Sequence, residues 1–241
     1  MSLAPWRTGI VRSIIDETPN TKRYVVEVPE LDVFDFVPGQ FVTLNLPIHE
    51  KPNKCWRSYS IASWPNGTNT FELVIVLLEG GLGTTYLFNQ VQVGNTLSYR
   101  GAQGVFTLPS AFDVPTYFIC TGTGIAPFRS MVQYIALHNI PHAPIHLVYG
   151  CRTQADLLYY NELVALHHNL PNYTYTPTLS RANWAGATGY VHSIYEQHCK
   201  ASNYAPAQFY LCGWKAMIDD AKQKITAMGY DKKCIHVEVY G

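Results

Sequence analysis

The spacing of apolar residues changes once along the chain, near residue 110, and this change limits the folds open to it. Before it, apolar and polar residues alternate with a period of two between turn segments such as 37–39 and 65–67, which predicts closely spaced antiparallel strands. After it, strand-like runs alternate with helix-like segments, which predicts a parallel sheet covered by helices. The sequence therefore predicts two domains, an antiparallel barrel or sandwich over residues 1–110 and an α/β domain over residues 111–241.

The expected elements can be placed by range. The first domain has six candidate strands, at 6–15, 22–28, 40–46, 57–63, 70–78 and 95–100. The second has five, at 116–120, 145–149, 173–177, 208–212 and 234–239. Helices are predicted over 128–139 and 214–228, because apolar side chains in each recur on one helical face.

Composition excludes several classes of protein. The 17 basic and 17 acidic residues cancel, so no overall charge draws the chain to nucleic acid or to an anionic membrane. The longest apolar run, 73–78, is too short to span a bilayer, and the first residues lack the apolar core of a signal peptide. We therefore expect a soluble cytoplasmic protein without a membrane span.

The cysteines and histidines do not indicate a metal site. The six cysteines lie far apart, without the close spacing of a zinc or iron–sulfur loop, so we expect reduced and mostly buried thiols. His138, His142 and His146 recur every fourth residue, but Pro141 and Pro144 interrupt any helix that would align them.

Arg57-Ser58-Tyr59-Ser60 offers the groups that bind a ring system ending in phosphate. On a strand, alternate side chains share a face, so Arg57 and Tyr59 point the same way. A guanidinium binds phosphate oxygens bidentately, the phenol ring offers a stacking surface, and Ser60 can hydrogen-bond the edge of a heterocycle. The alternative is an edge strand with an exposed arginine and a half-buried tyrosine.

Two glycine-rich loops are candidates for phosphate binding. Residues 79–87 follow the fifth strand with Gly80, Gly81 and Gly83, although a plain turn would have the same composition. Residues 120–127, Cys-Thr-Gly-Thr-Gly-Ile-Ala-Pro, stand between a predicted strand and a predicted helix, the context that makes a glycine loop a dinucleotide site. Pro127 stands where the usual fingerprint has its third glycine.

Polar residues also follow the later parallel strands. Arg152, Ser180 and Arg181 come directly after strands, where the carboxyl ends of a parallel sheet line a ligand crevice, although surface arginines capping element ends would look the same. Cys212 and Gly213 end another strand before a helix, with a buried structural cysteine as the alternative.

Taken in order, these segments resemble the ferredoxin–NADP reductase family, and the likeness extends over nearly the whole chain. It implies an FAD-binding β-barrel followed by an NAD(P)-binding α/β domain. In the barrel, the resemblance assigns Arg57, Gly81 and Thr84 to the flavin pyrophosphate, Tyr59 to stacking on the flavin ring, and Ser60 to a place near its N5 atom. Gly83 and the second threonine leave the alignment of this loop open by one residue.

In the second domain the resemblance assigns the following residues to the pyridine nucleotide: Thr121, Gly122, Thr123 and Gly124 to its pyrophosphate, Arg152, Ser180 and Arg181 to the 2′-phosphate of NADP, and Cys212, Gly213 and Met217 to the nicotinamide. Gly189-Tyr190 stands where some bacterial relatives have a further arginine, so NAD stays possible. The closing Val-Glu-Val-Tyr is similar to the end of plant-type reductases and gives Glu238 and Tyr240 as an acid and a ring covering the flavin, although Gly241 follows here.

These roles imply an enzyme of the ferredoxin- or flavodoxin-NADP(+) reductase type. A hydride would pass between NADP(H) and FAD, with Ser60, Cys212, Glu238 and Tyr240 as catalytic residues, and electrons would be exchanged with ferredoxin or flavodoxin. Because no iron–sulfur spacing is present, the electrons must leave for another molecule. Two alternatives stay open: an NAD(P)H reductase for free flavin, quinone or an oxygenase partner, and an electron-transfer subunit without independent turnover. We expect a monomer that binds no nucleic acid.

Overall fold

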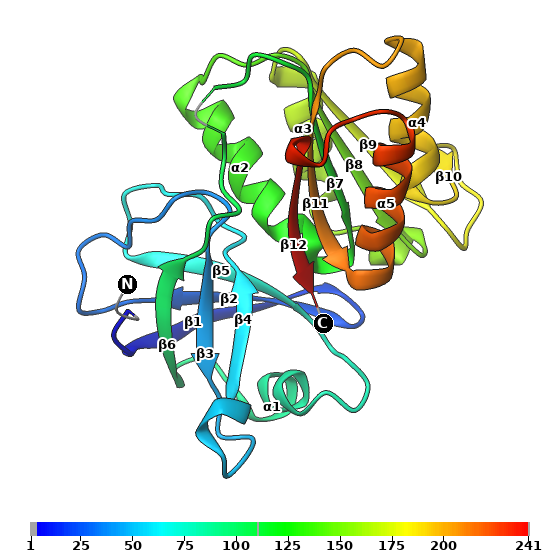
Figure 1. Ribbon diagram of the computed structural model, residues 1–241. Helices are drawn as coiled ribbons and strands as arrows, with labels where there is room; N and C mark the ends of the chain where they lie inside the picture. The colour runs from blue at the N-terminus through cyan, green and yellow to red at the C-terminus, as the bar shows by residue number, and fades with distance from the viewer. Residues whose placement is uncertain (1–3, 110, 241) are drawn as a thin grey trace. The chain divides into compact units, whose positions relative to one another are not determined.

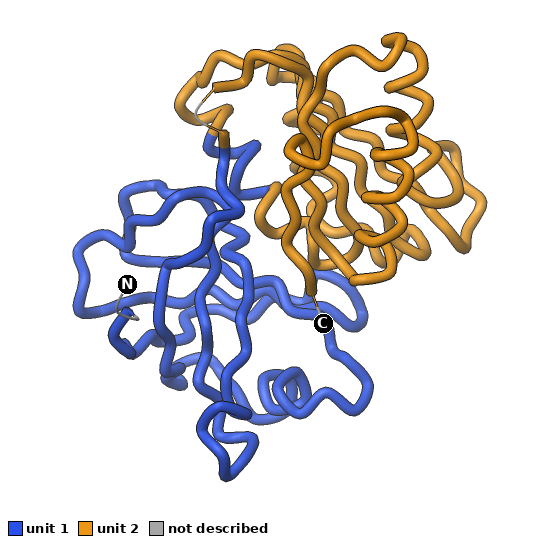
Figure 2. The backbone as a smooth tube through the Cα atoms, viewed as in Figure 1, with its two compact units in different colours: residues 1–108, 129–134 blue, residues 109–128, 135–241 orange. Residues whose placement is uncertain are grey.

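The computed structural model describes residues 4–109 and 111–240, which form two compact units. Unit 1 comprises Met1–Leu108 together with Arg129–Tyr134, and unit 2 comprises Pro109–Phe128 and Ile135–Gly241 (Figure 2). One helix therefore contributes residues to both units, which the periodicity of the sequence did not indicate.

Unit 1 is built on a six-stranded antiparallel sheet, as the first half of the sequence predicts (Figure 1). Its strands, in the order in which they pair across the sheet, are β4 (Trp56–Ser60), β3 (Phe41–Asn45), β6 (Thr96–Gln103), β1 (Arg7–Thr18), β2 (Thr21–Glu27) and β5 (Thr70–Val76). A short 3-10 helix, η1 (Pro52–Lys54), precedes β4, and helix α1 (Leu82–Gln90) follows β5. The alternating apolar residues of these strands form one buried cluster that includes Tyr24, Leu44, Leu73 and Tyr99.

The two outermost strands of this sheet, β4 and β5, are joined by hydrogen bonds just beyond the end of β4. These hydrogen bonds close the sheet into a barrel. The chain leaves β4 after Ser60, and the Ala62 N–H donates to the Glu72 carbonyl on β5 at 2.8 Å. The Glu72 N–H in turn donates to Ser63 Oγ at 3.0 Å. Residues 61–63, predicted as part of the fourth strand, therefore form the barrel seam instead.

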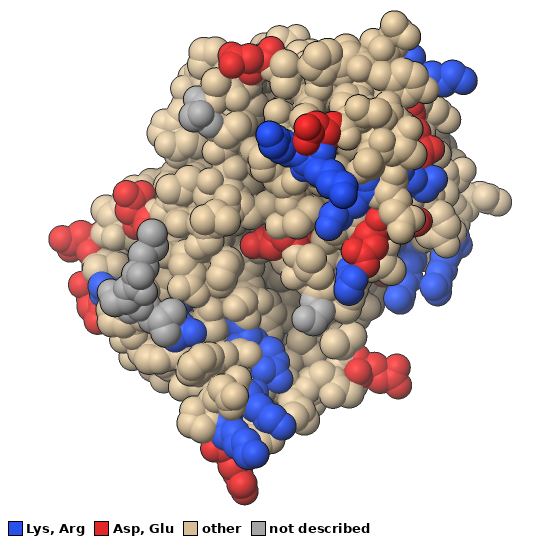
Figure 3. Space-filling view, in the orientation of Figure 1, with Lys and Arg blue, Asp and Glu red and all other residues tan. Residues whose placement is uncertain are grey.

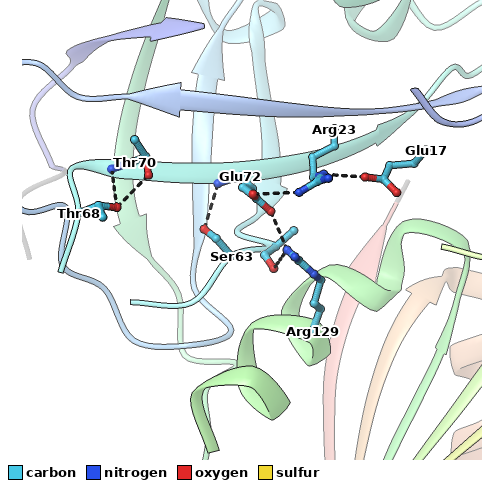
Figure 4. Close-up of polar contacts among 8 residues, drawn as sticks. Glu17, Arg23, Ser63, Thr68, Thr70, Glu72 and Arg129 are labelled. Carbon is cyan, nitrogen blue, oxygen red and sulfur yellow. Dashed lines mark hydrogen bonds and ion pairs between the residues drawn. The ribbon is translucent and has the colours of Figure 1, made fainter. Parts of the chain in front are cut away.

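An ion pair between the buried Arg129 and the part-buried Glu72 completes this seam (Figure 4). Arg129 Nη1 lies 2.6 Å from Glu72 Oε2 and donates to the Ala62 carbonyl at 2.9 Å, and the Arg129 side chain is 4% exposed. The other carboxylate oxygen of Glu72 accepts from Arg23, which also pairs with Glu17 at 2.6 Å. Glu72 thus holds the seam through both its backbone and its side chain.

Unit 2 is a parallel six-stranded sheet with helices, also as predicted (Figure 1). Its strands, in order across the sheet, are β10 (Ala187–Thr188), β9 (Tyr173–Leu179), β8 (Ile145–Cys151), β7 (Thr116–Thr121), β11 (Gln208–Trp214) and β12 (Ile235–Tyr240). The helices are α2 (Ile125–His138), α3 (Tyr160–Asn169), α4 (Val191–Ala201) and α5 (Lys215–Ala227), with the 3-10 turns η2 (Gly122–Gly124), η3 (Gln154–Asp156) and η4 (Lys232–Cys234). Across residues 4–109 and 111–240, no helix has the length and apolarity needed to cross a membrane.

One strand and two α-helices of unit 2 were not predicted. Strand β10 has two residues, too few to give a period. Helix α3 follows Tyr159, which adopts a left-handed conformation. The helix buries only Leu163, so the sequence shows no clear apolar face with a helical period. Helix α4 does carry a readable signal, since Val191, Tyr195 and Cys199 recur every fourth residue and are all buried.

We predict that Arg129→Met lowers the free energy of unfolding by about 2 kcal/mol, because it leaves the part-buried Glu72 carboxylate without its closest cation while Arg23 stays in place. Urea unfolding followed by far-UV circular dichroism measures the loss. Arg12→Met is the matched control, since Arg12 pairs with Glu27 at an exposed site and its removal should cost less than about 1 kcal/mol. Equal losses in the two variants would contradict the buried-pair interpretation.

A second prediction concerns two imidazoles in unit 2, whose rings lie 5.0 Å apart. Burial lowers the pKa of His146 to about 4 and also lowers the pKa of His198. Since the unfolded chain binds these protons more readily, stability should fall as the pH drops from 6.5 towards 4. His146→Phe keeps the stacking with Tyr117 and should reduce, by a few degrees, the fall in melting temperature between pH 7 and pH 5. His168→Phe, at an exposed position, should leave that fall unchanged.

Candidate functional site

The structure brings Arg57 of β4 against the first turn of α1. A Cβ atom built on Gly83 would lie 3.0 Å from Arg57 Cγ and 3.2 Å from Arg57 Nε, so a larger residue at 83 would push the guanidinium aside. The guanidinium is held by the carbonyls of Trp56 and Lys54, at 2.7 and 3.0 Å. A cation and the positive end of a helix dipole thus lie side by side, which is an arrangement that binds phosphate.

The Thr84 hydroxyl holds the loop before α1 in place through hydrogen bonds within the loop. Gly81 is the N-cap of α1, and the Thr84 hydroxyl donates to the Gly81 carbonyl at 3.1 Å and accepts from the Leu78 N–H at 3.1 Å. The hydroxyl assigned to the pyrophosphate is therefore engaged within the loop. Gly83, which the sequence left as an ambiguity of register, is the glycine that lies against the arginine.

Tyr59 and Ser60 follow Arg57 on β4. Tyr59 is half-buried and packs against the barrel core, and burial raises its pKa to about 12 against a smaller lowering by the Arg57 charge. The phenol is therefore neutral at physiological pH. Ser60 is 4% exposed and is the last residue of the strand, opposite Phe41 of β3.

In unit 2, the predicted dinucleotide loop lies between the end of β7 and the start of α2. Gly122 adopts a φ of +54°, with open space where a side chain would stand. A Cβ on Gly124 would lie 2.4 Å from the Cys212 carbonyl, so this glycine permits the loop to approach the end of β11. The predicted context of strand, glycine loop and helix is therefore present, with Thr123 in the same 3-10 turn.

Residues predicted around the nicotinamide gather at the carboxyl ends of β7 and β11. A Cβ on Gly213 would lie 2.6 Å from Thr121 Oγ1 and 2.9 Å from Met217 Cε. Thr121 Oγ1 is buried and, among residues 4–109 and 111–240, has no hydrogen-bond partner. A buried hydroxyl without a partner at a loop of this kind fits a ligand that would supply one.

Cys212 lies beside Glu238 and Tyr240. Its thiol donates to Glu238 Oε2 at 3.9 Å, and β12 pairs with β11 in parallel, with Glu238 opposite Cys212. Burial and then the Glu238 charge hold the pKa of Cys212 well above its usual range. The sulfur is therefore a neutral thiol and is not activated as a nucleophile. Gly241, the predicted departure after Tyr240, lies outside the described residues.

Arg152, Ser180 and Arg181 come together at the carboxyl ends of β8 and β9. The Arg181 N–H donates to the Arg152 carbonyl at 2.9 Å, and Ser180 Oγ donates to the Cys151 carbonyl at 3.2 Å. Both arginine side chains are exposed. Two cations on neighbouring strand ends can bind one dianionic group, as the sequence suggested.

Two family models match the chain, one in each unit. The oxidoreductase FAD-binding domain matches residues 9–108, and the oxidoreductase NAD-binding domain matches residues 118–223.

Curated relatives fall into two kinds. Ferredoxin--NADP reductase B of Sorangium cellulosum is 33% identical over 230 residues, which cover 92% of this chain and 93% of that protein. The anthranilate 1,2-dioxygenase electron transfer component of Acinetobacter baylyi is 36% identical over 193 residues, which cover 78% of this chain and 53% of that protein. A glycine betaine monooxygenase reductase subunit of Pseudomonas aeruginosa is 28% identical, covering 98% of this chain and 66% of that protein. The chain thus spans between half and two thirds of these oxygenase reductases.

Solved structures agree with the fold. A ferredoxin NADP+ reductase from Neisseria gonorrhoeae with bound FAD and NADP has a TM-score of 0.81 at 25% identity, over 98% of this chain and 99% of that chain. The cytochrome P450 reductase GcoB of Amycolatopsis has a TM-score of 0.86 at 24% identity, over 99% and 71% of the two chains. The predicted resemblance is confirmed. Since the Sorangium relative is similar across almost its whole length, the chain belongs to the ferredoxin–NADP reductase family, with an FAD-binding and an NAD-binding domain.

Proposed function

We propose that the chain is a flavoprotein oxidoreductase that passes a hydride between NADP(H) and FAD and exchanges electrons with ferredoxin or flavodoxin. The observation that supports this proposal is a pair of glycine-containing loops at the start of a helix, one in each unit, at Gly83 and at Gly122–Gly124, which we propose as phosphate sites. When bound, FAD supplies the chemistry that joins a two-electron donor to a one-electron carrier. The protein's own residues supply binding, orientation and control of protons.

In unit 1, Arg57 and the amides at the start of α1 bind the flavin pyrophosphate. Gly83 keeps them close enough to act on one anion, because its hydrogen leaves the guanidinium in place. Tyr59 presents a neutral ring face for stacking, and Ser60, buried at the end of β4, orients the reacting edge of the ring. Thr84 and Gly81 act indirectly, by fixing the loop.

In unit 2, the amides of Gly122, Thr123 and Gly124 bind the pyridine nucleotide pyrophosphate, and Thr121 Oγ1 gains the partner it lacks. Arg152, Ser180 and Arg181 bind the 2′-phosphate that distinguishes NADP from NAD. We assign Cys212 and Gly213 to the nicotinamide. The protonated Cys212 thiol would lie beside the nicotinamide ring without attacking it. The thiol stays protonated and donates a hydrogen bond to the Glu238 carboxylate.

Ferredoxin or flavodoxin is the proposed acceptor: the Sorangium relative is named for ferredoxin and matches along its length, and flavodoxin is a one-electron carrier of the same kind. A second candidate, the reductase of an oxygenase, is favoured by the anthranilate dioxygenase and glycine betaine monooxygenase relatives. Steady-state rates with ferredoxin, flavodoxin, free FMN and quinone separate the candidates. We also propose a monomer that acts in the cytoplasm, which sedimentation and cell fractionation test.

Arg57→Met should weaken FAD binding by about ten- to one hundred-fold, because it removes charge-assisted hydrogen bonds to the pyrophosphate. The recovery of flavin fluorescence on dilution measures the released cofactor. Arg12→Met, on another strand of the same barrel, is the control and should bind FAD as the natural protein does. A purified protein that stays colourless after addition of FAD would overturn the proposed function itself.

Arg181→Ala should slow the bleaching of bound flavin by low concentrations of NADPH by about ten-fold and leave the bleaching by NADH unchanged, since only NADPH carries the 2′-phosphate. Stopped-flow absorbance with the two nucleotides in parallel measures both rates. Lys200→Ala, an exposed change on α4, is the matched control for loss of one surface charge. If the natural protein reacts equally fast with both nucleotides, the assignment of the two arginines to a phosphate site is wrong.

A further inference from the structure

Strand β12 is the last in the order of its sheet, and its described partner is β11 alone. The backbone N–H and C=O groups along its other edge therefore have no strand partner among residues 4–109 and 111–240. Val237 and Val239, on this strand, are 40% and 52% exposed. An exposed strand edge with apolar side chains is a surface to which another extended segment can add.

A groove of about 580 Å³ runs between this strand and helix α5. It is lined by Lys222, Gln223, Thr226, Lys232, Ile235 and Val237. The groove lies on the face of β12 opposite the proposed nicotinamide residues, because alternation along the strand places Val237 on one face and Glu238 on the other. It therefore belongs to neither cofactor site.

The charged side chains that line the groove are all positive. Both charged residues that line it are lysines, Lys222 and Lys232, and neither has an ion-pair partner within the described part of the chain. The acids nearest in sequence do not line the groove: Asp219 pairs with Lys215, and Asp231, which keeps its charge, is held by the Lys233 N–H at 2.8 Å. Figure 3 shows Lys and Arg side chains near η4 and α5 in unit 2, with acidic side chains beside them. The groove therefore favours an acidic occupant.

We propose that an extended acidic segment of a partner protein binds in this groove by adding a strand to the free edge of β12. An edge strand beside a helix is the geometry in which extended peptides bind, where backbone hydrogen bonds give affinity and side-chain pockets give specificity. Alternate apolar side chains of the segment would pack on Ile235 and Val237, and its carboxylates would meet Lys222 and Lys232. A second copy of the chain fits less well, since pairing of two β12 edges would bring like charges together.

Short synthetic peptides in which valine alternates with glutamate, lysine or serine are the probe, each labelled with fluorescein. We expect the glutamate peptide to bind best by fluorescence anisotropy. Hydrogen exchange followed by mass spectrometry should then show slower exchange of the β12 amides, which simple charge attraction would not produce. Lys222→Glu should weaken binding of the glutamate peptide by about five-fold or more and leave flavin bleaching by NADPH unchanged.

Lys200→Glu, an equal charge reversal on the exposed face of α4, is the control and should leave peptide binding unchanged. The proposal is overturned if none of the peptides binds, which would mean that the lysines serve only to guard the edge against aggregation. Equal binding of the glutamate and lysine peptides, or an equal effect of Lys200→Glu, would also overturn it. Because flavin bleaching is measured separately, failure here leaves the proposed function untouched.

Discussion

The barrel depends on one carboxylate, that of Glu72, at the seam between its outermost strands. Its backbone binds Ala62 and Ser63, and its side chain binds Arg23 and Arg129. A carboxylate largely removed from water is costly unless cations and hydrogen-bond donors surround it, and here two guanidiniums do so. The same contacts hold the segment that follows Ser60. The residue proposed to orient the flavin edge is therefore rigid because the seam beyond it is closed.

The candidate phosphate sites rest on a different constraint, the absence of a side chain. Gly83 lets Arg57 lie on the first turn of α1, and Gly124 lets the loop after β7 approach the end of β11. In each case a methyl group would meet a neighbouring atom at 3.0 Å or less. These glycines determine which groups can converge on an anion, whereas the arginine and the hydroxyls determine how strongly they hold it.

Much of this could be predicted from the sequence, because the period of apolar residues and the placement of glycine are local properties. The longer strands of both units and the order of the segments follow from such signals, whereas Cys212, Glu238 and Tyr240 were grouped only through the resemblance to a known family. The partner of Glu72 could not be predicted, since Arg129 lies 57 residues away and only the folded chain brings them together. The role of Gly83 could not be predicted for a related reason. Three glycines stand within four positions, and only the direction of the Arg57 side chain in the folded chain decides at which of them a larger residue would collide with it.

Strand β12 shows how one element can carry two kinds of chemistry. On one face Glu238 and Tyr240 lie with the Cys212 thiol, whose raised pKa keeps that face free of a reactive sulfur anion. On the other face Ile235 and Val237 line a groove whose charged lining residues are Lys222 and Lys232. Because alternate residues of a strand point to opposite faces, a substitution such as one at Val237 alters the groove without touching the thiol. Docking of a partner and transfer of a hydride would therefore be separable by mutation, although the residues responsible are neighbours in sequence.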